Sequence, residues 1–125
     1  MVTGHRSGKL GAEVKSGTNK LLSDVSVELG GENQGMDPHR LLEASLISCT
    51  IITLQMYAQL KKIAIQDINV TVHIDSEGTE THMTREIGLV GELSDDQKKK
   101  LMEIAEKCPI HRLLSRHIVI ETLAR

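Results

Sequence analysis

The chain has 125 residues, a formal net charge of −2 and 39% apolar residues. This length fits a single globular domain, residues 1–125, with a sizeable core. Phe and Trp are absent and Tyr57 is the only tyrosine, which argues against binding single-stranded nucleic acid by aromatic stacking. The negative net charge argues against non-specific electrostatic binding to the phosphate backbone of nucleic acids. No apolar run approaches the ~20 residues of a membrane span, so we expect neither nucleic acid nor a membrane as a partner.

Residues 1–31 predict an N-terminal β-meander. Two short segments of mixed apolar and polar residues, 9–15 and 20–29, are separated by the turn-forming residues 16–19. Both segments read as strands. Gly30 and Gly31 end the second segment, and a polar loop follows.

A long central helix is predicted over residues 38–61. Asp37 is a favourable N-cap and Pro38 suits the first helical position. No Gly or further Pro interrupts the segment before Lys61. Its apolar residues cover nearly the whole circumference, which is typical of a helix that is buried on most sides. We therefore expect a sheet, a partner chain or both to cover it.

Residues 67–93 predict an antiparallel β-hairpin. The segment 68–75 alternates strictly between apolar and polar residues, as in a strand with one buried face, and this places His73 on the outward face. Glu77 and Gly78 form a turn. The period of two then recurs at residues 87, 89, 91 and 93.

Two helices and a final strand are predicted after the hairpin. Ser94, with Gln97 three positions later, forms a capping box at the start of a helix. Cys108 and Pro109 interrupt this helix and open a short third one, so residues 95–116 contain two helices. The β-branched residues 117–123 close the chain as a strand. Strands in blocks separated by helices indicate an α+β fold with a mostly antiparallel sheet.

Cys49 and Cys108 are the only cysteines, and a redox pair is the first hypothesis they suggest. The first residues contain no apolar signal segment, so we expect a cytoplasmic protein, in which cysteines are inert core residues or working thiols. Both alternatives are open on the composition alone. A structural zinc site needs about four closely spaced ligands, and the six histidines are scattered. No metal site is expected.

On position alone, Cys108 is the more reactive thiol. It lies at the N-cap of a helix, whose free N–H groups favour a thiolate. Cys49 lies in the middle of an apolar helix, where desolvation raises a thiol pKa unless the fold brings a cation close. His111, three residues after Cys108, is either a catalytic base or a first-turn polar residue. Arg6 lies in a glycine-flanked segment that suits either a flexible terminus or a side chain that reaches inward.

Two sequence blocks resemble the OsmC/Ohr family of hydroperoxide reductases, and the OsmC-like subgroup in particular. Residues 28–31 (ELGG) and 37–50 (DPHRLLEASLISCT) are similar to the family's Gly-rich loop and central helix. A second block, residues 89–114, which includes AEKCPIHRLL at 105–114, is similar to the family's second cysteine segment. The blocks occur in the family's order and together span nearly the whole chain.

The resemblance implies an OsmC-like fold, with a mostly antiparallel sheet around a long buried central helix, in an intertwined homodimer. It also implies a thiol peroxidase that reduces organic hydroperoxides to alcohols as part of an oxidative stress response. Cys49 is then the peroxidatic residue, which forms a sulfenic acid, and Cys108 resolves it as a Cys49–Cys108 disulfide. A dithiol, lipoyl-type in the family, reduces the disulfide, and no cofactor is needed.

Family members also hold an arginine against the peroxidatic thiolate and position it with a glutamate at the start of the central helix. Residues 3–6 (TGHR) resemble the Thr-Gly-Gly-Arg of the Ohr branch, which makes Arg6 the thiolate partner. His39 or Arg40 occupies the glutamate position and could support Cys49 directly, whereas Glu43 does not match the motif. This departure keeps a second hypothesis open: a weakly active or non-catalytic protein that binds a small apolar or thiol ligand at the dimer interface.

Overall fold

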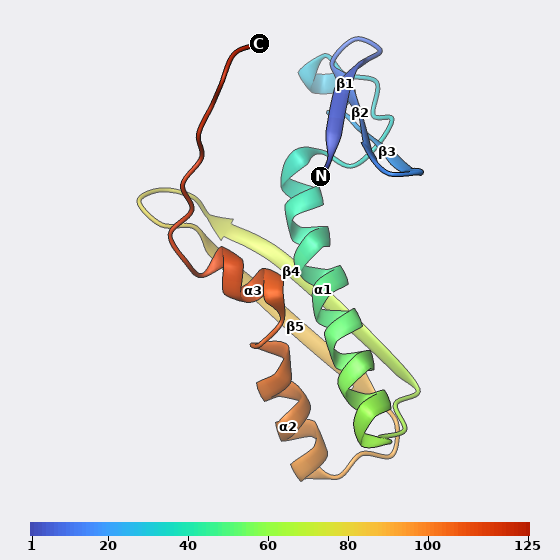
Figure 1. Cartoon of the computed structure of the whole chain (residues 1–125). Coiled ribbons are helices and arrows are strands. Elements are labelled where there is room, and N and C mark those ends of the chain that lie inside the picture. Colours follow the sequence, from blue (N-terminus) through green and yellow to red (C-terminus); the bar gives the residue numbers. More distant parts are fainter. The chain divides into compact units, whose positions relative to one another are not determined.

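The computed structural model describes all 125 residues, and they form two compact units, Met1–Leu42 and Glu43–Arg125. The single-domain organisation stays a prediction. Figure 1 shows the elements coloured along the chain. In chain order they are β1 (Thr3–Ser7), β2 (Gly11–Ser16), β3 (Asn19–Ser23), η1 (Val27–Leu29), α1 (Pro38–Lys61), β4 (Asp67–Ser76), β5 (His82–Val90), α2 (Asp95–Ala105) and α3 (Pro109–Leu114).

The first unit is built on a three-stranded antiparallel sheet in the order β1-β2-β3. A two-residue turn joins β2 to β3, with Ser16 paired to Asn19. Gly17 in this turn has a φ of 59°. Glycine reaches this left-handed region without strain, as the first position of a type II′ hairpin turn requires. The meander thus occupies residues 3–23, within the predicted range.

The chain leaves β3 at Ser23, and the prediction that the strand continues to residue 29 is wrong. Asp24 is buried, and its carboxylate accepts hydrogen bonds from the N–H groups of Val25 at 2.8 Å, Glu32 at 3.1 Å and Gln34 at 3.2 Å. These bonds fold residues 24–34 around the carboxylate. They satisfy backbone donors that a strand would otherwise present to a neighbour.

α1 has the predicted bounds, and its ends follow from local chemistry. Asp37 Oδ1 accepts a hydrogen bond from the Arg40 N–H at 2.9 Å, which satisfies one of the free donors of the first turn. Pro38 occupies the first helical position. After Lys61 the helix stops, because Lys62 adopts a left-handed φ of 55°.

In this chain α1 is buried on one face, whereas its apolar pattern predicts burial on most sides. The buried side chains follow helical spacing: Glu43, Leu46, Thr50, Leu54 and Ala58. Apolar side chains elsewhere on the helix are open to solvent, with Ile52 and Met56 exposed to 52% and 66%. By length and composition α1 is also able to cross a membrane, contrary to the expectation above. The core helix of a soluble protein passes the same test.

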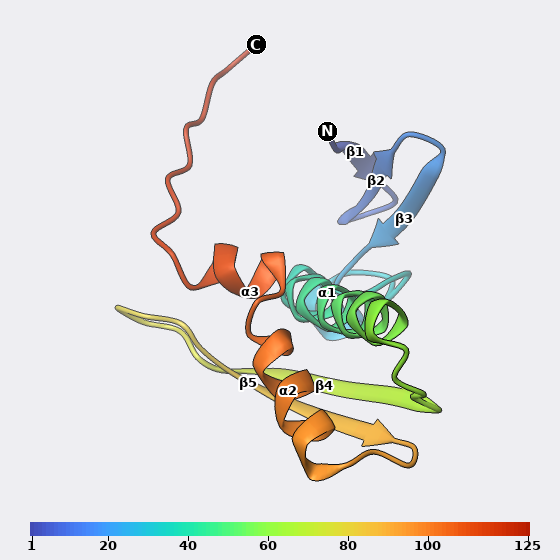
Figure 2. The ribbon, with the colours of Figure 1, turned by 60° about the horizontal axis from the view of Figure 1, so that its bottom comes forward.

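The second unit packs α1 and α2 against the hairpin of β4 and β5. Figure 2 shows both helices on the same face of the hairpin. Its core consists of Leu54, Leu101 and Ala105, which are almost completely buried, with apolar residues of both strands packed against them. The strands are antiparallel, as predicted. β5 begins at His82, earlier than the alternation indicated, and ends before Gly91, whose φ is 143°.

The predicted capping box opens α2. Ser94 Oγ accepts a hydrogen bond from the Gln97 N–H at 3.1 Å, and the Gln97 side chain accepts one from the Ser94 N–H at 2.9 Å. Pro109, which lacks an N–H and fixes its own φ, starts α3 after a short break. Two helices therefore lie within residues 95–116, as expected.

The C-terminal residues differ from the prediction. Residues 117–125 have no strand pairing, and Figure 1 shows them as an extended tail after α3. Ile118, Val119, Ile120 and Leu123 are exposed. β-branched side chains favour an extended backbone, but a strand also needs a neighbouring edge for its N–H and C=O groups, and this chain brings none beside the tail. The architecture is α+β, with two small antiparallel sheets and one long helix, as the sequence predicts.

Candidate active site

Two helices of the second unit bring the cysteines together. Cys49 lies in the middle of α1, and Cys108 is the N-cap residue of α3. Both are free thiols, and they form a hydrogen bond with each other. Cys108 is completely buried, whereas Cys49 is partly exposed. The fold therefore places the two sulfurs side by side, as a disulfide would require.

Several donors converge on the Cys49 sulfur. The Ile110 N–H lies 3.5 Å from Sγ, and Thr53 Oγ1, one turn along α1, lies 3.9 Å from it. Burial raises the pKa of Cys49, but the Ile110 N–H, the Cys108 thiol, the Thr53 hydroxyl and the charge of Arg85 together outweigh burial. The pKa of Cys49 therefore lies below that of an ordinary thiol, and Cys49 is the more acidic thiol of the pair.

Cys108 has the opposite character. Burial and the hydrogen bond with Cys49 raise its pKa, and they outweigh the His111 N–H, which lies 3.4 Å from Sγ. A negative charge on Cys49 raises it further. The helix N-terminus thus favours a Cys108 thiolate less than its position predicts, because burial and Cys49 outweigh the N–H groups of His111 and Ile110.

The cation at this site is Arg85, a residue that was not predicted from the sequence. It lies in β5, and its guanidinium donates from Nη1 to Thr50 Oγ1 at 3.0 Å. Nη2 lies 2.9 Å from His111 Nδ1. A signal was present in the sequence. Arg85 lies between Met83 and Ile87 in the alternation of β5, so it is a lone charge on the inner face of a strand.

His111 is part of the site through its ring as well as its backbone. Arg85 donates to Nδ1, so this nitrogen carries no proton and the neutral ring carries its proton on Nε2. Its backbone N–H meets Cys108. The structure therefore pairs the ring with an arginine, and the role of His111 as a catalytic base stays a prediction.

Three other predicted residues lie in the first unit. Arg6 is an exposed residue of β1, paired with Ala12 across the ladder. His39 and Arg40 are exposed residues of the first turn of α1. Their roles at Cys49 stay predictions.

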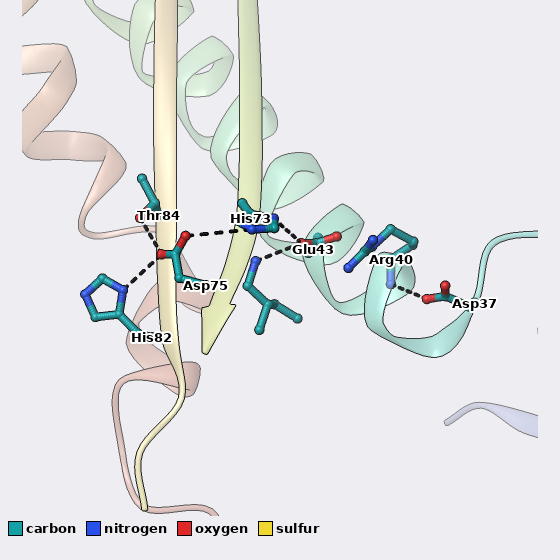
Figure 3. A network of polar contacts seen from close by, with 8 residues as sticks. Asp37, Arg40, Glu43, His73, Asp75, His82 and Thr84 are labelled. Carbon is teal, nitrogen blue, oxygen red and sulfur yellow. Dashed lines mark hydrogen bonds and ion pairs between the residues drawn. The ribbon is translucent and has the colours of Figure 1, made fainter. Parts of the chain in front are cut away.

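Figure 3 shows a second polar cluster, around Glu43 and Asp75. Glu43 is buried on α1, and its Oε2 accepts the Ile74 N–H at 2.8 Å and lies 3.9 Å from His73 Nδ1. This carboxylate therefore anchors α1 to β4. His73 points outward, as predicted, with 71% of its side chain exposed.

Asp75 completes this cluster on the hairpin. It accepts hydrogen bonds from the Thr84 hydroxyl at 2.6 Å and from His82 Nδ1 at 2.9 Å. These two bonds, the first above all, lower the pKa of Asp75. Asp75 therefore stays ionised and helps to hold the end of the hairpin together.

An open cavity of about 410 Å³ adjoins the guanidinium and the imidazole. Arg85 and His111 form part of its wall, and neither cysteine does. The remaining residues around it are apolar or neutral apart from one histidine: Leu46, Thr81, His82, Met83, Leu114 and Ser115. A ligand of mixed apolar and anionic character would suit such a wall.

The chain is similar to several known proteins. The family model for OsmC-like proteins matches residues 31–123. A solved structure from Psychrobacter arcticus, whose name links it to osmotic stress induction and a detoxification response, is 22% identical, with a TM-score of 0.77 and coverage of 93% of this chain and 87% of that one. No curated protein sequence matches the chain.

Two further solved structures share the fold. A Legionella pneumophila protein named as the organic hydroperoxide resistance protein OsmC is 22% identical, with a TM-score of 0.67 and coverage of 91% of this chain and 87% of that one. An OsmC-like protein from Mycoplasma pneumoniae is 19% identical, with a TM-score of 0.75 and coverage of 92% and 86%. The family model includes both cysteines and most of the chain, and the chain belongs to the family of OsmC-like proteins.

Proposed function

We propose that the protein is a thiol-dependent peroxidase that reduces organic hydroperoxides to alcohols. The observation that carries the proposal is the pair of contacting thiols whose pKa values are displaced in opposite directions, that of Cys49 downward and that of Cys108 upward. A peroxidatic cysteine attacks as the thiolate, so the lowered pKa favours Cys49 over Cys108 for that role. The name of the Legionella relative agrees with this substrate class.

The reaction follows from these protonation states. The Cys49 thiolate attacks the terminal oxygen of the hydroperoxide, the O–O bond breaks, and the leaving alkoxide takes up a proton to become the alcohol. Cys49 is then a sulfenic acid. The sulfur of Cys108 attacks the Cys49 sulfur and displaces hydroxide, which leaves as water with the proton of Cys108. A dithiol then reduces the Cys49–Cys108 disulfide and is itself oxidised to a disulfide.

The surroundings of Cys49 support the first step. Partial exposure lets a peroxide reach Sγ, whereas Cys108 is completely buried. The Ile110 N–H and the Thr53 hydroxyl stabilise the thiolate in the free enzyme. We also propose, from the motif resemblance, that Arg6 contributes a further positive charge. Arg6→Ala would then slow peroxide consumption.

The same proposal includes a cytoplasmic homodimer and a lipoyl-type dithiol as reductant. Exposed apolar residues of α1 and of the C-terminal tail support self-association, because surfaces of this kind are rarely left open to water. Ile52, Met56, Val119 and Ile120 are all more than half exposed. Sedimentation of the purified protein at several concentrations tests the dimer.

Peroxide consumption in the presence of a dithiol tests the activity. The wild-type chain is expected to consume cumene hydroperoxide with dihydrolipoamide as reductant, and Cys49→Ser is expected to consume none above background. Equal rates for the two proteins would contradict the proposal. Ser48→Ala, an exposed neighbour of Cys49 on α1, is the matched control.

A second candidate function is ligand binding, because the cavity beside Arg85 suits a small ligand. In this alternative the chain is a weakly active or non-catalytic protein that binds an apolar or thiol-bearing molecule. Native mass spectrometry of freshly purified protein would then show a retained small molecule, and the two thiols would stay reduced after peroxide treatment.

A further inference from the structure

Arg85 connects the two helices that carry the cysteines. Its Nη1 meets Thr50, the residue that follows Cys49 on α1. Its Nη2 meets His111, in the first turn of α3 after Cys108. One rigid planar group therefore bridges the two backbone segments whose sulfurs must join.

At the Thr50 end of this bridge, the direction of each hydrogen bond is fixed. Thr50 is completely buried, and its hydroxyl donates to the Leu46 carbonyl oxygen at 2.6 Å. The hydroxyl proton is thus committed, and the oxygen can only accept from Arg85. A guanidinium donates and never accepts, so the donor and acceptor roles match without rearrangement.

The His111 end is fixed in the same way. Nδ1 accepts from Arg85, while the backbone N–H of His111 points at the Cys108 sulfur. The adjacent Ile110 N–H points at the Cys49 sulfur. A movement of this turn would therefore displace the contacts of both sulfurs at once.

The charge of Arg85 is not neutralised by either contact, because a hydroxyl and a neutral imidazole are its partners. The guanidinium is partly buried on the inner face of β5, where an uncompensated charge is costly. An anion nearby lowers this cost. The Cys49 thiolate is such an anion, and Arg85 stabilises it through its charge.

We propose that Arg85 is a positioning residue that clamps α1 to α3, through Thr50 and His111, and thereby keeps the Cys49 and Cys108 sulfurs within bonding reach. The biological purpose of this clamp rests on the proposed peroxidase function. Its effect on the rate at which the Cys49–Cys108 disulfide forms does not, because that rate can be measured with any thiol oxidant. The clamp requires the two-pronged donor of arginine, because a lysine ammonium at this position keeps the charge but loses the planar fork that spans Thr50 and His111.

Disulfide formation with diamide tests the clamp without depending on peroxidase activity. Diamide accepts the two electrons and two protons that the thiols lose. Arg85→Lys and Arg85→Met are both expected to form the Cys49–Cys108 disulfide roughly 10- to 100-fold more slowly than the wild type, because small misplacements of reacting atoms have effects of this size. Arg116→Ala, which removes an exposed positive charge just after α3, is the matched control and should react at the wild-type rate. Circular dichroism verifies that every variant is folded.

The pH dependence of Cys49 alkylation separates charge from geometry. Arg85→Met should raise the pKa of Cys49 and move the alkylation profile toward higher pH, whereas Arg85→Lys should leave the profile close to that of the wild type. His111→Asn, whose amide oxygen can accept from Arg85 as Nδ1 does, should restore most of the disulfide rate lost in His111→Ala.

The clamp is wrong if both Arg85 variants form the disulfide at the wild-type rate, or if His111→Ala and His111→Asn react equally fast. Loss of peroxide consumption has no part in these readouts. A failure of the proposed peroxidase function would therefore leave the result on Arg85 interpretable, and a failure of the clamp would leave the peroxidase test unchanged.

Discussion

Cys49 and Cys108 are neighbours in space, yet they differ in exposure and in the direction in which their pKa values are displaced. Cys49, in the middle of α1, is partly exposed and receives the Ile110 N–H, the Cys108 thiol, the Thr53 hydroxyl and the charge of Arg85. Cys108, at the N-cap of α3, is completely buried and meets the His111 N–H. The pKa of Cys49 is lowered, and the pKa of Cys108 is raised. Tertiary contacts therefore outweigh the position of a cysteine within a helix.

Replacing each cysteine by serine gives the largest expected effect. Cys49→Ser should lower the rate of dithiol-dependent peroxide consumption by roughly 10³-fold or more, because the nucleophile is lost. Cys108→Ser should still reduce one equivalent of peroxide and stop at the sulfenic acid, which dimedone traps. If Cys108→Ser, and not Cys49→Ser, abolished the first equivalent, the assignment of the two roles would be reversed.

Replacing Cys108 by two different residues isolates its hydrogen bond to Cys49. Cys108→Ala removes the donor and should raise the pKa of Cys49, whereas Cys108→Ser keeps a hydroxyl donor and should raise it less. The pH dependence of iodoacetamide alkylation at Cys49 measures both. Identical profiles for the alanine and serine variants would show that Cys108 contributes no hydrogen bond to the thiolate.

The two wild-type thiols should also titrate in a fixed order. As pH rises from acid, Cys49 loses its proton first because its pKa is lowered, and Cys108 follows above the ordinary thiol range because its pKa is raised. Mass spectrometry after brief alkylation should therefore find label on Cys49 alone at neutral pH. Equal labelling of both residues would contradict the proposed difference between the pKa values of Cys49 and Cys108.

The Thr53 hydroxyl should have a smaller effect than either cysteine. Its oxygen lies 3.9 Å from Cys49 Sγ, a long contact even for sulfur. Thr53→Val keeps the shape and removes the hydroxyl, so the pKa of Cys49 should rise slightly and the peroxidase rate should fall by about twofold. Thr71→Val, at an exposed position of β4, is the control with the same chemical change. An unchanged pKa of Cys49 in Thr53→Val would show that the hydroxyl does not stabilise the thiolate.

Local signals were sufficient to predict the starts of α1 and α2 and the first strand of the hairpin. Asp37 and Pro38 indicate the start of α1, and Ser94 with Gln97 indicates the start of α2, because capping depends on residues a few positions apart. The alternation of residues 68–75 predicts β4 and the outward direction of His73. The family resemblance adds the pairing of the two cysteines, which no local pattern could supply.

Features that depend on distant residues could not be predicted in this way. Asp24 turns the chain after β3 through N–H groups up to ten residues away, so the local pattern suggested a longer strand. The tail after α3 has strand-forming residues but no strand edge beside it in this chain. Arg85 acquires its partners from α1 and α3, and only its place in the apolar register of β5 hinted at a special role.

The fate of the two thiols after one equivalent of peroxide is the most direct test of the account. Reduced protein is treated with stoichiometric cumene hydroperoxide, digested without reductant and analysed by mass spectrometry. The account predicts a disulfide between the peptides that contain Cys49 and Cys108 within one chain, with one equivalent of alcohol formed. Two free thiols and unconsumed peroxide would contradict it.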